Sequence, residues 1–269
     1  MKNKLLIFLA FAVLIIACTT NAITGRSQLS LVSEESLQQE AVSQYRSFLS
    51  QNKVVSSNNN RDAEMVKRVG NRIANAITKY YRDKGISKEL EGYKWEFNLV
   101  DNKDVNAWCM PGGKVVVYTG LLNITKNEAA LAIVMGHEIT HAVARHGQER
   151  ISQAFAAQGI GLLGDVFTSG NQNANQIFNA VFAPGAQVGV LLPNSRKQEL
   201  EADHYGLIFA AMAGYNPREA IPFWQRMASA KNNQQQPPEI LSSHPLDDKR
   251  IKELNKHMDE ALKYYTPVK

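Results

Sequence analysis

Apolar residues recur at helical spacing in the first part of the chain. Residues 33–51 and residues 62–82 each carry apolar side chains four positions apart on a polar background. These stripes consist of Leu37, Ala41, Tyr45 and Leu49 in the first segment and Met65, Val69, Ile73 and Ile77 in the second. The pattern predicts two amphipathic helices, separated by the polar run NKVVSSNNN.

The pattern then changes from helical to alternating. Residues 93–101 alternate aromatic or aliphatic with polar residues, which is typical of a half-buried strand. The run Pro111–Gly113 separates two further apolar stretches, residues 105–110 and 114–118, and predicts the turn of a β-hairpin. The sequence therefore predicts a small sheet directly before the next helical segment.

A long helix is predicted to follow and to end near residue 156. Thr125 and Glu128 match a capping box, with Thr125 as the N-cap. Between residues 157 and 194 the composition shifts to Gly, Ala, Asn and Gln with short apolar clusters. Polar residues and a proline interrupt these clusters, so we expect a flexible helical hairpin rather than a membrane span.

Three more helices are predicted in the last third of the chain. Ser195 and Gln198 form a second capping-box pattern, and Asn216 followed by Pro217 indicates another helix start. The last helix is predicted over residues 245–263. The expected fold class is α+β: mostly helical, with a small sheet or hairpin before the long helix.

The first residues, MKNKLLIFLAFAVLIIACTT, have the proportions of a secretory signal: a short basic start, then an apolar stretch. The sequence IIAC resembles a bacterial lipobox, whose cysteine carries lipid and becomes the new N-terminus. An uncleaved anchor or an ordinary signal peptide is the alternative. We expect residues 1–17 to be a lipoprotein signal peptide, Cys18 the lipidation site, residues 18–30 a tether and residues 31–269 one domain outside the cytoplasm.

The amino-acid composition indicates a globular protein and does not narrow its function further. The chain of 269 residues is 44% hydrophobic and 20% charged, as in ordinary soluble domains. Without Lys2 and Lys4 of the expected signal peptide, the formal charge falls from +5 to +3. This bias is small, and no basic run with interleaved aromatic residues occurs, so nucleic acid is not an expected partner. If Cys18 carries lipid, Cys109 has no cysteine partner.

The stretch GHEITHAVARHG contains an H-E-x-x-H pattern, His137 to His141. On a helix these two histidines project from one face, about one turn apart, so both imidazoles can reach one metal ion. Glu138 lies beside that ion and can accept a proton from a water molecule. The pattern alone is moderately specific, and a polar helix that happens to be rich in histidine is the alternative.

A catalytic zinc ion needs three protein ligands and an open position. In KQELEADHYG, Glu199 and Asp203 lie on one helical face, with Ala202 between them and Glu201 pointing roughly to the opposite side. Glu199 can bind the metal, and Asp203 can orient a ligand histidine by accepting its second N–H. The alternative is an acidic helix start that interacts with the helix dipole.

HEITH followed by ELEAD resembles the gluzincin peptidases related to the CAAX prenyl protease and HtpX, and most of all their single-domain bacterial lipoprotein and periplasmic members. The runs NAWCMPGGKVVVYTGLL, HAVARHGQER and SSHPLDDKRI agree with this resemblance, which covers roughly residues 30–262. It implies a zincin-like fold and one zinc ion per chain, with His137, His141 and Glu199 as ligands and Glu138 as general base.

The same resemblance implies that the strand after Pro111–Gly113 lines the cleft and pairs with extended substrate. One departure from the family pattern is Cys109, where an apolar residue without a thiol is expected. The thiol would leave the edge of the cleft open to oxidation or heavy metals.

His244 in SSHPLDD is implied by the family pattern to approach the metal. It would either stabilise the oxyanion or occupy the open coordination position, and Arg250 could assist. The alternative is a surface histidine in a capping turn. We expect His146 to be solvated or structural, and we find no partners for His204 and His257.

These features favour a zinc endopeptidase that is lipid-anchored in the bacterial envelope and faces the periplasm, at the outer rather than the inner membrane. The resemblance alone implies that its substrates are unfolded or misassembled envelope proteins; the membrane that holds its lipid is the other expected partner. The chain ends soon after the last predicted helix, so we expect no tetratricopeptide module. The rival hypothesis is an assembly or chaperone-like factor with latent or no proteolysis, and another metal-dependent hydrolase is a third.

Overall fold

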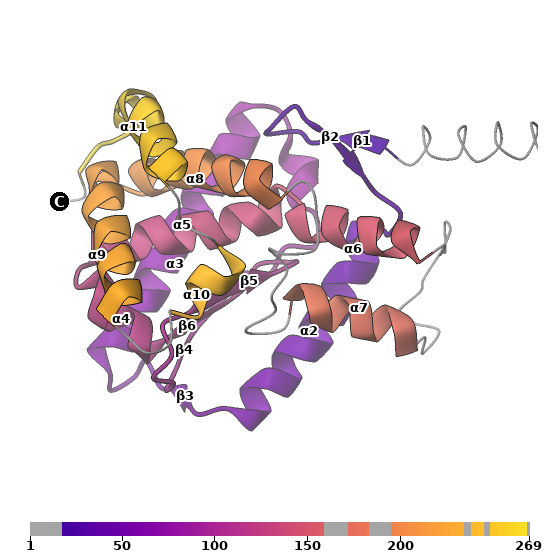
Figure 1. The fold of residues 1–269 in the computed structure, drawn as a ribbon, viewed down its shortest axis with the longest axis horizontal. Helices are drawn as coiled ribbons and strands as arrows, with labels where there is room; N and C mark the ends of the chain where they lie inside the picture. Colours follow the sequence, from indigo (N-terminus) through magenta and orange to yellow (C-terminus); the bar gives the residue numbers. More distant parts are fainter. Residues whose placement is uncertain (1–17, 159–171, 183–194, 234–237, 245–247, 268–269) are drawn as a thin grey trace, which may run out of the picture.

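The structure is a computed structural model that describes residues 18–158, 172–182, 195–233, 238–244 and 248–267 (Figure 1). The predicted signal peptide, residues 1–17, lies outside these ranges, as do most of residues 157–194, for which a helical hairpin is expected. Among the described residues, no helix combines the length and apolar character needed to cross a membrane.

Helices make up most of the described chain, and the α+β prediction is confirmed. The strands are β1 (Cys18–Thr20), β2 (Ser27–Leu29), β3 (Val54–Val55), β4 (Glu96–Val100), β5 (Ala107–Met110) and β6 (Lys114–Tyr118). The helices are α2 (Glu34–Gln51), α3 (Arg61–Asp83), α4 (Thr119–Thr125), α5 (Glu128–Val143), α6 (His146–Ala157), α7 (Gln172–Phe182), α8 (Ser195–Met212), α9 (Ala220–Asn233), α10 (Ile240–Ser243) and α11 (Asp248–Lys263). Two 3₁₀ helices are η1 (Ser87–Leu90) and η3 (Pro217–Glu219).

The larger sheet has the order β3-β4-β6-β5. Strands β5 and β6 pair antiparallel around a turn in which Gly112 and Gly113 have φ of 75° and 80°, so the predicted hairpin is confirmed. The strand after this turn, β6, is paired on both sides, with β4 and with β5. The expectation that it pairs with substrate is therefore wrong; in the described part of the chain the edge strands of this sheet are β3 and β5.

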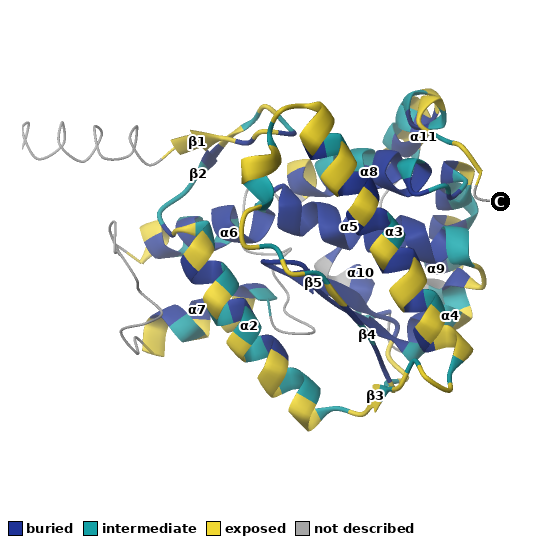
Figure 2. Cartoon of the chain, turned by 180° about the vertical axis from the view of Figure 1, so that it is seen from behind, coloured by how far each residue is buried: buried dark blue, intermediate teal, exposed yellow. Residues whose placement is uncertain are grey.

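The sheet separates two hydrophobic cores. On β6, Val115 and Val117 face the larger core, which α3, α5, α8 and α9 complete. Val116 and Tyr118 face the smaller core, which includes residues of α2, α6 and α7. Helix α5 lies inside the larger core, and every residue from Ala130 to Val143 is buried (Figures 1 and 2). The H-E-x-x-H segment therefore occupies the most enclosed helix.

Helices α5 and α8 approach closely where each has a glycine. A Cβ on Gly136 would lie 2.8 Å from the carbonyl oxygen of Gly206, and one on Gly206 would lie 2.9 Å from the backbone nitrogen of His137. Only glycine allows this approach without a shift of backbone. The contact brings the helix that carries Glu199 against the helix that carries His137.

The long helix predicted to end near residue 156 is interrupted. Helix α5 ends at Val143, Arg145 adopts a left-handed conformation with φ of 56°, and α6 begins at His146. The predicted N-cap is also wrong: Thr125 ends α4, and Asn127 caps α5 by accepting a hydrogen bond from the backbone N–H of Ala130. Both differences come from local turns that helical periodicity does not detect.

The segment expected to be a tether is folded onto the domain. Strands β1 and β2 form a hairpin, and the buried side chains of Asn21 and Gln28 both donate hydrogen bonds to the carbonyl of Ala144. Arg26 pairs with Glu149 and Glu201. The small polar residues that suggested a flexible tether instead supply hydrogen bonds at the break between α5 and α6.

The C-terminal predictions are largely confirmed. Asn216 caps η3 through the backbone N–H of Arg218, with Pro217 at the first helical position. Helix α8 begins at Ser195 as expected, although the side chain of Ser195 lies outside the described set. The last helix is described from Asp248.

Candidate metal centre

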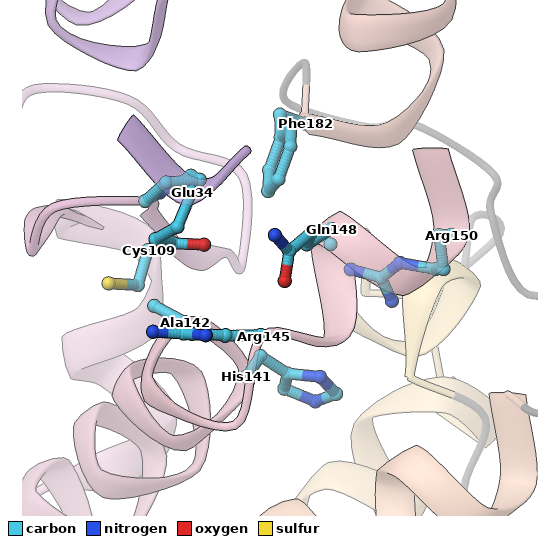
Figure 3. Close-up of a pocket in the computed structure, with 10 residues that line it drawn as sticks. Glu34, Cys109, His141, Ala142, Arg145, Gln148, Arg150 and Phe182 are labelled. Carbon is cyan, nitrogen blue, oxygen red and sulfur yellow. The ribbon is translucent and has the colours of Figure 1, made fainter. Parts of the chain in front are cut away.

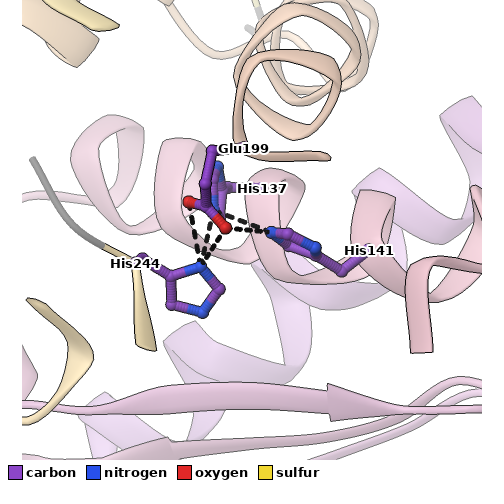
Figure 4. Close-up of side chains that lie close together, drawn as sticks. All are labelled: His137, His141, Glu199 and His244. Carbon is purple, nitrogen blue, oxygen red and sulfur yellow. Dashed lines mark hydrogen bonds and ion pairs between the residues drawn. The ribbon is translucent and has the colours of Figure 1, made fainter. Parts of the chain in front are cut away.

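Four buried side chains from three helices meet in one cluster (Figure 4). His137 and His141 lie one turn apart on α5, Glu199 comes from the first turns of α8, and His244 ends α10. Their potential ligand atoms all lie within 4.8 Å of one another. The three residues expected to bind metal and the histidine expected to approach it are thus brought together.

The spacing of the donor atoms fits a single zinc ion. The Nε2 atoms of His137 and His141 are 3.1 Å apart, and each lies 3.4 Å from an oxygen of Glu199. Ligands at ~2.0–2.1 Å around a tetrahedral zinc are separated by roughly 3.3–3.4 Å. The Nδ1 atom of His244 lies 3.0 Å from Glu199 Oε1 and 3.3 Å from His137 Nε2. Two imidazoles and one carboxylate are also a usual donor set for zinc.

A buried carboxylate and a buried guanidinium lie behind His137. Its Nδ1 contacts Asp203 Oδ1 at 2.9 Å, and Arg250 donates to both oxygens of Asp203 at 2.7 and 2.8 Å. Arg250 also lies 3.2 Å from Glu199 Oε2 and stacks over the ring of Trp224 at 4.4 Å. Asp203 and Arg250 therefore lie where their predicted supporting roles require, and the roles themselves stay predictions.

His141 has a supporting chain of its own, which sequence analysis missed. Its Nδ1 lies 2.9 Å from Nδ1 of His146, whose Nε2 lies 2.9 Å from Glu201 Oε2. Glu201 in turn pairs with Arg26 of the N-terminal hairpin. His146 was expected to be solvated or structural; it is fully buried, so it is not solvated and its place is structural. On a continuous helix His146 would point away from His141; the left-handed residue Arg145 turns it back.

Glu138 is buried beside the cluster without a hydrogen bond to its Oε1 from any described residue. His244 Nε2 lies 3.5 Å from that oxygen. Burial raises the pKa of Glu138 above its ordinary value, which favours the protonated form. An unbonded buried oxygen with a raised pKa suits a group that accepts and returns a proton.

The remaining electrostatics favour a bound cation. Burial lowers the pKa of His141 well below its usual value, so its imidazole is neutral. Burial acts to raise the pKa of Glu199, but His244 and Arg250 hold it well below its ordinary range. Burial also acts to lower the pKa of His137, but hydrogen bonds to Asp203 and Glu199 raise it to about 9. A metal ion would compete with this extra proton on His137.

A small pocket opens beside His141 (Figure 3). Arg150 points into it from α6, and Cys109 lines it from β5. The thiol of Cys109 is buried, and burial raises its pKa well above its usual value, so it is a poor nucleophile. Burial disfavours the reactive thiolate, whereas reaction of Cys109 with oxidants or heavy metals stays a prediction; the pocket also presents the guanidinium of Arg150.

Glu34, on the wall of this pocket, predicts a dependence of stability on pH. Burial raises its pKa from 4.5 to about 7, although Arg145 acts to lower it. Ionising Glu34 in the folded protein is therefore unfavourable, and stability present below pH 4.5 is lost as the pH rises through about 7. We expect Glu34→Gln to stabilise the protein at pH 8 by about 1–3 kcal/mol and to leave stability unchanged at pH 4.5.

Urea unfolding of the wild type and variant at both pH values measures this difference. Glu35→Gln is the matched control, because Glu35 lies in the same first turn of α2 but is exposed. We expect Glu35→Gln to change stability by less than about 0.5 kcal/mol at either pH. An equal effect of Glu34→Gln at pH 4.5 and pH 8 would contradict the assignment.

A histidine pair on one helix, a glutamate from a second helix and the buried carboxylate of Glu138 beside them define a zinc metallopeptidase of the H-E-x-x-H class. The chain matches Peptidase family M48 over residues 60–258 and belongs to this family. The expected class of enzyme and zinc as its cofactor are confirmed at the level of the family.

Several metalloendopeptidases are similar to the chain. The mitochondrial metalloendopeptidase OMA1 of Arabidopsis thaliana is 39% identical over 68% of this chain and 36% of its own length. The enzyme of the same name from Saccharomyces cerevisiae is 31% identical over 69% of the chain and 53% of its own. The β-barrel assembly-enhancing protease of Yersinia pestis is 31% identical over 64% of this chain and 36% of its own length. The chain thus spans about a third to a half of the length of these relatives.

Proposed function

We propose that this protein is a zinc endopeptidase in which His137, His141 and Glu199 hold the metal and Glu138 is the general base. The observation that carries the proposal is the convergence of two Nε2 atoms and one carboxylate at ligand spacing, next to a buried glutamate oxygen without a hydrogen bond among the described residues.

The protein groups divide the chemistry between them. When bound, zinc supplies Lewis-acid chemistry: it polarises the scissile carbonyl and makes a nearby water more acidic. Glu138 Oε1 takes the proton of the attacking water and passes it to the leaving amine. Asp203 and His146 hold the two ligand imidazoles in position through their Nδ1 atoms.

His244 has two possible roles in this scheme, and its geometry supports one of them at rest. Its Nδ1 faces Glu199 and His137, inside the donor cluster, while its Nε2 faces Glu138. This placement suits a ligand in the position that substrate would take. Movement of His244 out of the cluster would then open the site and leave its imidazole free to stabilise the oxyanion.

The substrate is proposed to bind as an extended chain along β5. This edge strand packs beside α5, and no described strand pairs with its outer side. Backbone hydrogen bonds to a strand edge do not depend on the side chains of the substrate, so unfolded segments of many sequences would fit. The pocket with Arg150 lies at the end of β5, next to His141.

We further propose that the protein acts on misfolded or misassembled envelope proteins, as a lipid-anchored, periplasm-facing member of the single-domain HtpX-like branch. Similarity to a protease named for β-barrel assembly supports an envelope substrate. The exposed Cys18, which begins β1, supports a lipid on the surface of the domain, with residues 1–17 as its signal peptide. The outer membrane is the proposed location.

The test is proteolysis of unfolded casein by the full chain after loading with zinc, after removal of zinc by a chelator, and after reloading. We expect cleavage only in the loaded and reloaded samples, with internal peptide bonds cut, and no cleavage of a tightly folded control protein. If the loaded chain binds casein and leaves it uncut, the rival function as an assembly or chaperone-like factor gains support and the peptidase proposal fails.

A further inference from the structure

A second group of potential metal ligands lies outside the site described above. His204 on α8 faces His257 and Glu260 on α11, and the donor atoms of these three residues lie within 4.8 Å of one another. His204 Nε2 is 2.7 Å from Glu260 Oε2, and His257 Nδ1 is 3.8 Å from the same oxygen. The two imidazoles stack with their centroids 3.8 Å apart. Neither histidine was expected to have a partner, and these contacts show that this expectation is wrong.

We propose that His204, His257 and Glu260 form a second metal site, which binds a divalent transition-metal ion such as Zn²⁺ and joins α8 to α11. Two imidazole nitrogens and a carboxylate oxygen are ligands that zinc accepts, whereas magnesium and calcium prefer oxygen alone. One nitrogen of each imidazole lies within 3.8 Å of the same oxygen of Glu260, so the three donor atoms are close enough for a single ion to replace these contacts.

The side chains have room to adjust to an ion. His204, His257 and Glu260 are 22%, 32% and 45% exposed, so none is fixed in the core and solvent can complete the coordination shell. Zn–N distances of ~2.0–2.1 Å require ligand atoms roughly 3.3 Å apart. To reach that separation, His257 Nδ1 must move toward Glu260 Oε2 and His204 Nε2 must move away from it, each by about half an ångström. Partly exposed side chains can make such shifts.

The position of the site gives it a structural consequence. His204 directly follows Asp203, whose carboxylate accepts hydrogen bonds from Arg250 of α11. Helix α11 lies against α8 (Figure 1). It contacts α8 through Arg250 at one point and through His257 and Glu260 at another. A metal ion at the second point would hold α11 on α8 and so keep Arg250 against Asp203.

The proposal is tested by calorimetric titration of Zn²⁺ into the full chain. We expect the wild type to bind one further equivalent after the first, and the Tm to rise by about 2–5 °C with this second equivalent. His257→Ala and Glu260→Gln should each weaken the second equivalent at least tenfold. Asp259→Asn is the control, because Asp259 is an exposed acidic residue of the same helix outside the cluster.

Two results would overturn the second site. One is the absence of any second equivalent in the wild type at millimolar zinc; the other is a second equivalent of equal affinity in His257→Ala. Because His257 is partly exposed, its variant should fold, and the Tm without metal checks this. The outcome is independent of the peptidase proposal, because His257→Ala and Glu260→Gln leave unchanged the residues that bind the first equivalent of zinc.

Discussion

Replacing Glu138 with glutamine is expected to reduce kcat for casein cleavage by a factor of about 10²–10⁴ and to leave zinc content unchanged. Glutamine has the same shape but cannot take a proton from water. The carboxylate of Glu138 is not among the converging donor atoms, so metal binding does not need it. Replacing this buried carboxylate should not destabilise the fold, because burial already disfavours the ionised form of Glu138.

Glu128→Gln provides the matched control for this experiment. It makes the same substitution on the same helix, at a partly exposed residue that pairs with Arg68 on the surface. Since exposed ion pairs contribute at most about 1 kcal/mol, we expect little change in kcat or stability. Substantial casein cleavage by zinc-loaded Glu138→Gln, at more than a tenth of the wild-type rate, would remove Glu138 from the role of base.

Replacing Arg250 with methionine is expected to destabilise the zinc-free protein by about 3–5 kcal/mol. Arg250 is 3% exposed and is the cation that lies against both Asp203 and Glu199. Its loss leaves two buried carboxylates without that partner, which costs more than the pairing itself contributes. Zinc should reduce the loss, because the ion compensates the charge of Glu199. Urea unfolding with and without zinc measures both effects.

A double variant and a control make this prediction specific. Arg250→Met combined with Asp203→Asn should recover part of the stability, because one of the stranded charges is gone. Arg226→Met is the control: Arg226 donates to the carbonyls of Ile124 and Thr125 and pairs with no carboxylate in the described residues. We expect Arg226→Met to lower the free energy of unfolding by only about 1–2 kcal/mol. Equal losses for Arg250→Met and Arg226→Met would contradict the account.

The residues of the primary cluster could be predicted because local geometry fixes them. The spacing of His137 and His141 places both on one helical face whatever surrounds the helix. Glu199 and Asp203 share a face for the same reason, and glycine and alanine residues indicate a helix that packs closely. The hairpin before the helix was equally local, since Pro111–Gly113 requires a turn.

The supporting parts could not be predicted because they depend on tertiary contacts. His146 reaches His141 only because a single left-handed residue, Arg145, breaks the helix between them. The N-terminal hairpin docks through Arg26 on carboxylates of α6 and α8, which no periodicity indicates. Which strand lies at the edge depends on the order of pairing, and the contact of His204 with α11 depends on how two helices pack.

The proposed peptidase requires one zinc ion held between α5 and α8 at the H-E-x-x-H segment. Anomalous diffraction at the zinc edge from crystals of the zinc-loaded protein locates this ion. We expect an anomalous peak within about 2.0–2.2 Å of His137 Nε2, His141 Nε2 and a Glu199 oxygen. A fully loaded crystal with no peak between these three residues would contradict it.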